Sequence, residues 1–193
     1  DPLLPKLFAI KPRADFEIRL VEPFREASSS SGSYQGPPQD GSRPGIFYVN
    51  AYDLKARPRY AMESLYLHEA TPGHHFQIAL QRELTELPAF RRFGGETAYN
   101  EGWGLYAESL GKELGVYTDP AMYFGALSAE LWRSIRLVTD TGIHAKGWTR
   151  QQVLDFMYAN SAVEPAVAIS EAERFMAIPG QALAYKIGEL KIR

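Results

Sequence analysis

The spacing of apolar residues changes character near residue 58. Before it, apolar residues alternate with polar ones or form short aromatic and β-branched runs, which favours strands over 16–20 and 45–54. After it, they recur every three or four residues, which is the period of an amphipathic helix. The segment 28–45 between the two predicted strands is rich in Ser, Gly and Pro, so we expect a long loop or a flexible insertion there.

Residues that start and stop helices divide the second part of the chain. The predicted helices cover 59–69, 76–84, 96–114, 120–144, 149–161, a short stretch beginning at Ser170, and 181–192. Capping residues mark three of their N-termini: Asp119 before Pro120, Thr149, and Ser170 three residues before Glu173. We therefore expect a mainly α fold with a small β-sheet near the N-terminus. A strand-and-loop segment, 1–58, and a helical segment, 59–193, would form one domain.

The composition is that of an ordinary globular protein, with 45% hydrophobic and 23% charged residues among 193. A net charge of −2 gives no attraction to nucleic acid or to an anionic membrane, so we expect neither as a partner. The lack of cysteine excludes disulfides, thiolate zinc sites and cysteine nucleophiles. No apolar run reaches the length of a membrane span, and the first residues, DPLLPKLFAI, lack the features of a signal peptide. We therefore expect a piece of a longer protein.

Three of the four histidines lie in one short stretch, LHEATPGHHFQ: His68, His74 and His75. Neutral imidazole is a good zinc ligand, and a catalytic zinc takes three protein ligands plus water. In the HExxH motif, two histidines four residues apart share one face of a helix. On a regular helix His68 and His74 would point roughly 120° apart, and His75 would lie about 10 Å from His68 along the axis. A regular helix therefore cannot bind zinc with either pair.

The Pro72-Gly73 pair offers a way around this obstacle. Pro72 has no N–H to donate to the carbonyl of His68, and Gly73 tolerates unusual backbone angles. If the segment ATPG bulges out by two residues, His74 takes the place of the second histidine of HExxH and His75 points elsewhere. The sequence thus predicts a metal site with His68 and His74 as ligands.

A carboxylate from the predicted helix 96–114 is expected to complete this site. Glu101 is the first candidate, and Glu96 at the start of the helix is an alternative. Glu108 lies two turns after Glu101 on the same side of the helix. It could instead orient a ligating histidine through a hydrogen bond.

Four motifs resemble one known family: HEATPGHHFQ, YNEGWGLYAE, DTGIHAKGW and PGQALAYKIG. Over about residues 43–193 they are similar to the bacterial domain-of-unknown-function 885 family, which in turn resembles the gluzincin group of zinc metallopeptidases. The resemblance implies a zincin-like, gluzincin-like catalytic domain. It also implies that residues 1–193 are the single catalytic, C-terminal part of a longer protein whose N-terminal part is a partner. Some members are exported or are lipoproteins, which suggests a periplasmic or lipoprotein parent, although this chain carries no signal for it.

The wider group also implies which residues bind the metal. Several of its branches have HExGH, and Gly73-His74 fits this pattern with two extra residues after Glu69. In the same group an Asn-Glu pair often provides the third ligand, as Asn100-Glu101 would here. The implied cofactor is Zn²⁺.

Other residues acquire candidate roles in substrate binding and catalysis from the same resemblance. The strand before the HExxH helix usually pairs with an extended peptide, so segment 46–52, with Asn50, is expected to bind substrate by strand addition. Related enzymes stabilise the oxyanion with a Tyr or His from the late part of the chain, which makes Tyr185 and His144 candidates.

The predicted reaction is hydrolysis of a peptide or similar amide bond. Zinc would polarise the carbonyl and lower the pKa of its water, and Glu69, next to the first ligand, would act as general base. Arg136 could anchor a substrate carboxylate bidentately, and so could Arg133.

Two other functions fit the same residues. A non-catalytic, zinc-stabilised module would close the site with four ligands, so His75 would join the other three. A metal-dependent hydrolase of a non-peptide amide or ester would use the same site, and a substrate panel would separate it from a peptidase.

Overall fold

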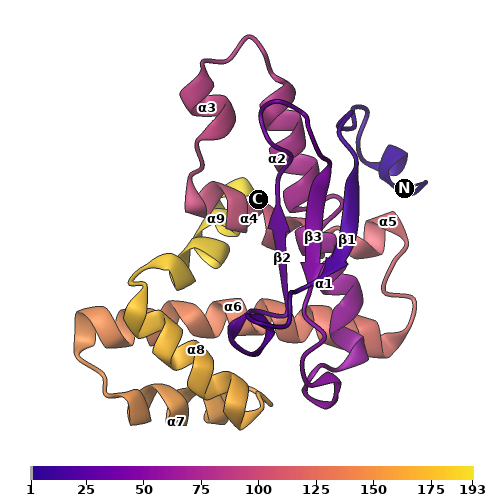
Figure 1. Ribbon diagram of the computed structural model, residues 1–193. Coiled ribbons are helices and arrows are strands. Elements are labelled where there is room, and N and C mark those ends of the chain that lie inside the picture. Colours follow the sequence, from indigo (N-terminus) through magenta and orange to yellow (C-terminus); the bar gives the residue numbers. More distant parts are fainter. Residues whose placement is uncertain (1) are drawn as a thin grey trace.

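Three strands near the start of the chain form one small sheet beside two helices (Figure 1). The computed structural model describes residues 2–193, apart from the side chain of Ala56. The strands are β1 (Phe16–Leu20), β2 (Gly32–Gln35) and β3 (Gly45–Val49), in the order β1-β3-β2. Strand β3 runs parallel to β1 and antiparallel to β2. Both strands that the sequence predicts are present, and β3 ends earlier than expected.

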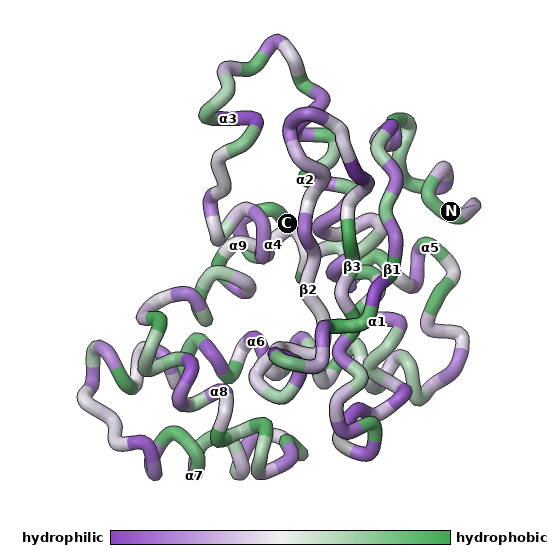
Figure 2. Tube along the Cα trace, viewed as in Figure 1, coloured by the Kyte–Doolittle hydropathy of each residue, from purple (hydrophilic) through white to green (hydrophobic). Residues whose placement is uncertain are grey.

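Strand β2 corrects the prediction of one long loop over 28–45. Its composition, GSYQ, is weakly hydrophobic, and Figure 2 shows it in white and purple beside the green β3. Tertiary contacts stabilise it instead: the Tyr34 hydroxyl lies 2.9 Å from Nδ1 of His75. At Gly32, an added Cβ would lie only 2.9 Å from the Leu65 side chain. Local propensity is overridden by these contacts with the helices.

The expectation that segment 46–52 forms a free edge of the sheet is wrong, because it contains the central strand. Strand β3 pairs with β1 on one side and β2 on the other, so the backbone groups of residues 46–49 are engaged in the sheet. The edges of the sheet are β1 and β2. A hydrophobic central strand flanked by more polar edge strands is the usual arrangement.

Nine α-helices fall within the described residues. They are α1 (Met62–Glu69), α2 (His74–Glu83), α3 (Ala89–Phe93), α4 (Thr97–Ser109), α5 (Gly111–Leu114), α6 (Pro120–Lys146), α7 (Arg150–Asn160), α8 (Pro165–Ala177) and α9 (Ala184–Ile192). The 3₁₀ turns are η1 (Leu4–Lys6), η2 (Glu26–Ser28), η3 (Leu54–Ala56), η4 (Arg59–Ala61) and η5 (Gln181–Leu183). The prediction of a mainly helical fold with a small sheet is confirmed. None of these helices is long and apolar enough to cross a bilayer.

The predicted helix starts are correct at two of three places. Asp119 accepts a hydrogen bond from the backbone of Ala121, and Thr149 forms a capping box with Gln152. The capping box predicted for Ser170 is wrong, because Ser170 lies in the middle of α8. That helix begins at Pro165, which occupies a first-turn position that tolerates proline.

Two other helix predictions need correction. The expected helix 96–114 is interrupted at Leu110, and the chain continues as the short α5. At the start of α5, Gly111 lies so close to Tyr117 that a side chain would clash with the ring. Helix α3 was not predicted; its five residues are too few to show a helical period.

The long helix α6 runs along the lower side of the view in Figure 1, from below the sheet to α7 and α8. Helices α7 and α8 pack against its second half around a core that includes Val153, Met157 and Phe175. Helix α4 packs against both α1 and α9, and all three contact α6. The histidine-rich segment joins α1 to α2 at the centre of this arrangement.

Candidate metal centre

A buried turn separates His68 from His74. Helix α1 ends at Glu69 and α2 begins at His74, so the chain forms two helices rather than one helix with a bulge. The indole N–H of Trp103 donates a hydrogen bond to the carbonyl of Pro72 at 2.7 Å, which fixes the turn to α4. An added Cβ on Gly73 would lie 1.9 Å from the carbonyl oxygen of His68. Glycine is therefore required here by the close approach of the turn to α1.

This turn brings His68, His74 and Glu101 together. The Nε2 atoms of both histidines lie 3.3 Å from the same oxygen, Oε2 of Glu101. One potential ligand atom from each of the three residues lies within 4.8 Å of the other two. Two donors on a tetrahedral zinc with bonds of about 2.0–2.1 Å lie roughly 3.3 Å apart. The spacing of the nitrogens from the carboxylate oxygen therefore fits a zinc ion.

Glu108 holds the ring of His68 from the other side. Its Oε1 lies 2.7 Å from Nδ1 of His68 and 3.0 Å from a guanidinium nitrogen of Arg133, and Ser64 donates to Oε2. Burial alone would raise the pKa of Glu108, but Arg133, His68 and Ser64 outweigh burial and lower it. A charged Glu108 fixes the Nδ1–H tautomer of His68, which leaves Nε2 free to bind a metal.

The two carboxylates also change the basicity of His68. Burial opposes its charged form, but Glu101 and Glu108 together raise its pKa to about 9. The pKa of Glu101 is correspondingly lowered: burial raises it, and hydrogen bonds from His68 and His74 outweigh that effect. The largely buried cluster thus holds a carboxylate charge that a cation would neutralise.

Glycines allow the close packing of α4 around this cluster. An added Cβ on Gly104 would lie 2.7 Å from Cε1 of His68. Gly102, next to Glu101, meets Gly188 of α9 so closely that a Cβ on it would lie 2.4 Å from the Gly188 backbone. Helices α4 and α9 therefore cross with their main chains in contact, which fixes Glu101 relative to α9.

His75 points away from the cluster, as expected from the break. Its ring is buried, with Nδ1 2.9 Å from the Tyr34 hydroxyl and its centroid 4.7 Å from that of the Phe16 ring. Burial lowers the pKa of His75, which suits a neutral ring packed between strands and helix.

Glu69 and Tyr185 lie beside the three clustered residues. Glu69 is buried, and its Oε2 has no hydrogen-bond partner among the residues described. The Tyr185 ring is stacked on His68 with centroids 6.1 Å apart. The side-chain amide of Gln181 lies 3.2 Å from the Tyr185 hydroxyl and 3.4 Å from Oε1 of Glu101. Gln181 thus connects the carboxylate to the phenol.

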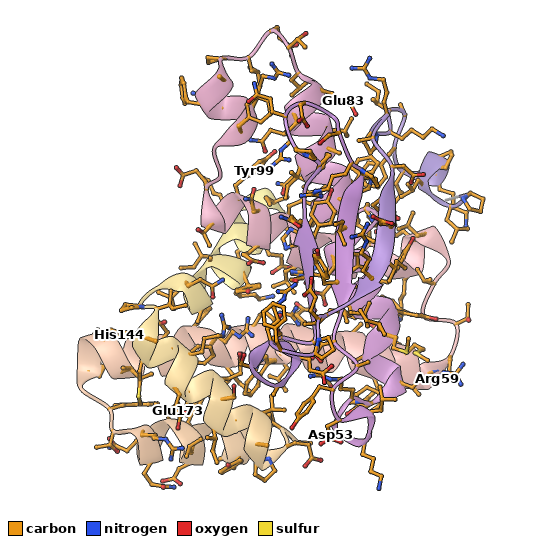
Figure 3. The ribbon with its side chains drawn as sticks, viewed as in Figure 1. Asp53, Arg59, Glu83, Tyr99, His144 and Glu173 are labelled. Carbon is orange, nitrogen blue, oxygen red and sulfur yellow. The ribbon has the colours of Figure 1, made fainter. Side chains whose placement is uncertain are left out.

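Two predicted site residues lie elsewhere, and both predictions are corrected. Asn50 is buried and fully engaged: its amide donates to the carbonyls of Glu26 and Ser29, and its oxygen accepts from the backbone of Tyr52. It therefore organises a loop and has no group left for substrate. His144 is exposed near the end of α6, where Figure 3 labels it, with Nε2 on a backbone carbonyl of α8.

Arg136 reaches the neighbourhood of the cluster, two turns of helix before His144. That separation is about 12 Å along the axis. Its guanidinium lies 4.6 Å from the centre of the Tyr185 ring and 2.5 Å from a carboxylate oxygen of Glu171. Glu96 immediately precedes α4 and is not among the clustered residues.

The whole chain, residues 1–193, matches the family model described as "Bacterial protein of unknown function (DUF885)". The chain belongs to the DUF885 family. Among curated proteins, none matches the chain.

Two solved structures are similar to this DUF885 chain. A "putative lipoprotein" from Colwellia psychrerythraea is 43% identical, with a TM-score of 0.96, over 99% of this chain and 33% of that one. A "putative lipoprotein of unknown function" from Shewanella oneidensis is 22% identical, with a TM-score of 0.77, over 98% of this chain and 35% of that one, and shows the fold alone. The DUF885 chain therefore spans about a third of the length of the solved structures that it matches.

Several residues of this DUF885 site were not predicted. Gln181 belongs to the motif PGQALAYKIG, but a glutamine gives no signal of its own in a single sequence. Glu171 pairs with both Arg136 and Arg174, and Arg174 donates to the oxygen of Gln181 at 3.0 Å. These residues come from α6, α8 and the turn η5, so only the tertiary fold reveals the network.

Proposed function

We propose that this DUF885 chain holds a catalytic zinc ion and hydrolyses peptide bonds, as a gluzincin-like metallopeptidase does. The observation that carries the proposal is the position of Oε2 of Glu101, 3.3 Å from Nε2 of His68 and 3.3 Å from Nε2 of His74. Without a metal, His68 would have to be doubly protonated to satisfy carboxylates at both ring nitrogens. With a metal, Nδ1–H donates to Glu108 and Nε2 binds the ion.

A catalytic site is favoured over a closed structural site. Structural zinc usually has four protein ligands, whereas catalytic zinc has three and an open position. His75 is the histidine that would have to close the site, and it is held between Tyr34 and Phe16. The three clustered residues therefore suit a catalytic ion.

When bound, zinc supplies a Lewis acid that polarises a carbonyl and makes water more acidic. Glu69 would accept the proton of the attacking water and deliver it to the leaving amine. Its unpartnered, buried Oε2 supports this role, because a carboxylate oxygen without a partner is costly unless a ligand or water engages it.

Tyr185 would stabilise the developing oxyanion. The Gln181 amide has only N–H groups to offer at Nε2, so the Tyr185 oxygen accepts that hydrogen bond and its own O–H remains able to donate. A donor positioned before reaction stabilises the transition state without reorganisation. His144 has no part in this proposal, because it lies at the far end of α6.

A peptide would bind along β2. Strand β2 is an edge of the sheet and contacts both α1 and α2, the helices that carry His68 and His74. An extended substrate could add to this edge through main-chain hydrogen bonds. Hydrolysis of a non-peptide amide or ester at the same site is separated from peptide hydrolysis by a substrate panel.

The names of the solved relatives support export of the parent protein. Both are described as putative lipoproteins. We therefore place this chain, as part of the proposal, in a protein that is exported and lipid-anchored.

Replacing Glu69 with Gln tests the mechanism. Zinc content, measured by mass spectrometry of metals, should stay near one ion per chain, because Glu69 is not a ligand. The turnover number on a peptide panel should fall about 10²–10⁴-fold, as for loss of a general base. Glu86→Gln, at an exposed position in the loop after α2, is the matched control and should retain both properties.

Three outcomes would contradict the proposal. Near-normal turnover of Glu69→Gln would exclude Glu69 as the base. Loss of zinc in Glu69→Gln would make Glu69 a ligand. A wild-type chain that retains zinc and cleaves nothing in a panel of peptides, amides and esters would be a zinc-stabilised module.

A further inference from the structure

Helix α6 carries a row of exposed apolar side chains. The row consists of Phe124, Leu127, Leu131 and Val138, with exposed fractions of 54%, 46%, 47% and 41%. At about 100° per residue, the four positions fall within roughly 60° of one another around the helix and span about 21 Å. Single exposed apolar residues are ordinary, but several on one helix face mark an interaction surface. We call these four residues the α6 stripe.

Helix α9 contacts α6 and carries apolar residues of the same kind. Its Ile187 and Leu190 are also exposed, at 52% and 60%. The Nζ atom of Lys186 lies 2.8 Å from a carboxylate oxygen of Glu130, and this ion pair connects α9 to α6. Helix α9 therefore lies beside α6, and both helices carry exposed apolar residues.

A hollow of about 170 Å³ lies between α4 and the first half of α6, next to the C-terminal residue that follows α9. Leu127 of the α6 stripe and Arg193, just after α9, both line it, together with Tyr123 and Glu130. Glu108 forms part of its wall. A ridge-shaped partner with one bulky side chain would fill the hollow and cover the apolar row.

We propose that the α6 stripe and the adjoining face of α9 bind an amphipathic helix from the remaining part of a longer DUF885 protein. Spacings of three, four and seven residues place the stripe on one face of α6, and such a face can pack lengthwise against the apolar face of a second helix. The bound helix would also cover the side of Glu108 opposite the candidate metal centre.

The solved relatives provide the reason for choosing this occupant. The Colwellia structure matches 99% of this chain with a TM-score of 0.96, yet only 33% of its own length takes part. About two thirds of that protein must therefore pack somewhere against the shared fold or extend away from it. A long row of exposed apolar residues is the kind of surface that such a packed segment covers.

The absence of cysteine from this chain makes a labelling experiment possible. Leu131→Cys places a thiol in the α6 stripe, and Gln151→Cys places one at an exposed polar position of α7. In this chain alone, both thiols should react with a maleimide at rates within a few-fold. The same two aligned positions are then tested in the full-length Colwellia protein, with any native cysteines changed to serine. There the position aligned with Leu131 should react at least tenfold more slowly than the position aligned with Gln151.

Labelling in urea should be equal at both positions and serves as the reference for intrinsic reactivity. Equal native labelling rates at both positions of the full-length Colwellia protein would overturn the proposal. Protection of Leu131→Cys in this chain alone, with a dimer in sedimentation velocity that Leu131→Glu dissociates, would also overturn it and make a second copy the occupant.

Discussion

The rings of His68 and His74 meet edge-to-face with centroids 4.6 Å apart, although the residues are six positions apart in the sequence. On a regular helix their side chains would diverge by roughly 120°. The buried turn between α1 and α2 removes this divergence, and Gly73 and Trp103 hold the turn against α1 and α4. The proposed metal centre therefore depends on a break in the helix, in place of the continuous helix of HExxH.

Replacing each neighbouring histidine with alanine should separate metal binding from packing. His74→Ala should lose most of the zinc, because it removes one of three ligands. His75→Ala should retain zinc but lower the melting temperature, because it removes the contacts with Tyr34 and Phe16. Metal analysis and thermal denaturation of both variants provide the comparison. Equal zinc loss in both would refute the choice of His74.

A methyl group at Gly73 should be severely destabilising. Its Cβ would lie 1.9 Å from the His68 carbonyl oxygen and 2.3 Å from that of Leu67, so the turn must move. We expect Gly73→Ala to lower the free energy of unfolding by about 1–3 kcal/mol or more, and to lower zinc affinity. In the control Gly36→Ala, the Cβ meets the flexible end of the Arg82 side chain and, at 3.1 Å, a methyl group of Ile78, but no backbone atom. Urea denaturation that shows the same loss for both variants would contradict this explanation.

Glu108→Gln should weaken zinc binding without removing a ligand. The amide retains the shape of the carboxylate but loses the charge that pairs with Arg133 and orients His68. Changes of this kind typically cost about 10–100-fold in metal affinity. Competition with a chromophoric chelator measures the effect, and Glu113→Gln, at an exposed position of α5, is the control. An unchanged affinity would show that Glu108 does not tune His68.

Stability in acid should depend on Glu171. Burial raises the pKa of this carboxyl, but Arg136 and Arg174 outweigh burial and lower it from 4.5 to about 2. A lowered pKa in the folded state stabilises the protein above pH 4.5, and this contribution is lost as the pH falls from 4.5 toward 2. Its upper bound is roughly 3 kcal/mol.

Melting temperatures measured across this pH range test the prediction. Glu171→Gln should melt lower than wild type at neutral pH, and the difference should shrink between pH 4.5 and 2. Glu173→Gln, on the same helix but 58% exposed, should follow the wild type throughout. A difference in melting temperature between Glu171→Gln and wild type that stays constant down to pH 2 would be inconsistent with a titrating Glu171.

The sequence predicts best what depends on local pattern. The strand at 16–20, the helix starts at Asp119 and Thr149, and the break before His74 all follow from a few neighbouring residues, and the structure contains them. The β2 strand does not, because it depends on the partners of Tyr34 and Gly32 in distant helices. Tertiary contacts override weak local propensity in such segments.

The convergence of His68, His74 and Glu101 could be expected from motif spacing, but the support around it could not. Asn50 and Gln181 show the difference. Both are uncharged amides. The Asn50 side chain donates its hydrogen bonds to loop carbonyls, whereas the Gln181 side chain bridges Glu101 and Tyr185. Only three-dimensional neighbours distinguish a structural amide from a site amide.

The main-chain contact between Gly102 and Gly188 has a consequence for the order in which the site forms during synthesis. Residues 68–101 leave the ribosome well before residues 181–188, whereas a domain generally folds as one unit. A nascent chain would therefore carry all three candidate ligands before α9, the helix that fixes Glu101, is available. Gln181 and Tyr185 join when α9 meets α4 at the two glycines. The candidate metal centre and the phenol that the proposed chemistry requires would thus be completed in the same folding step.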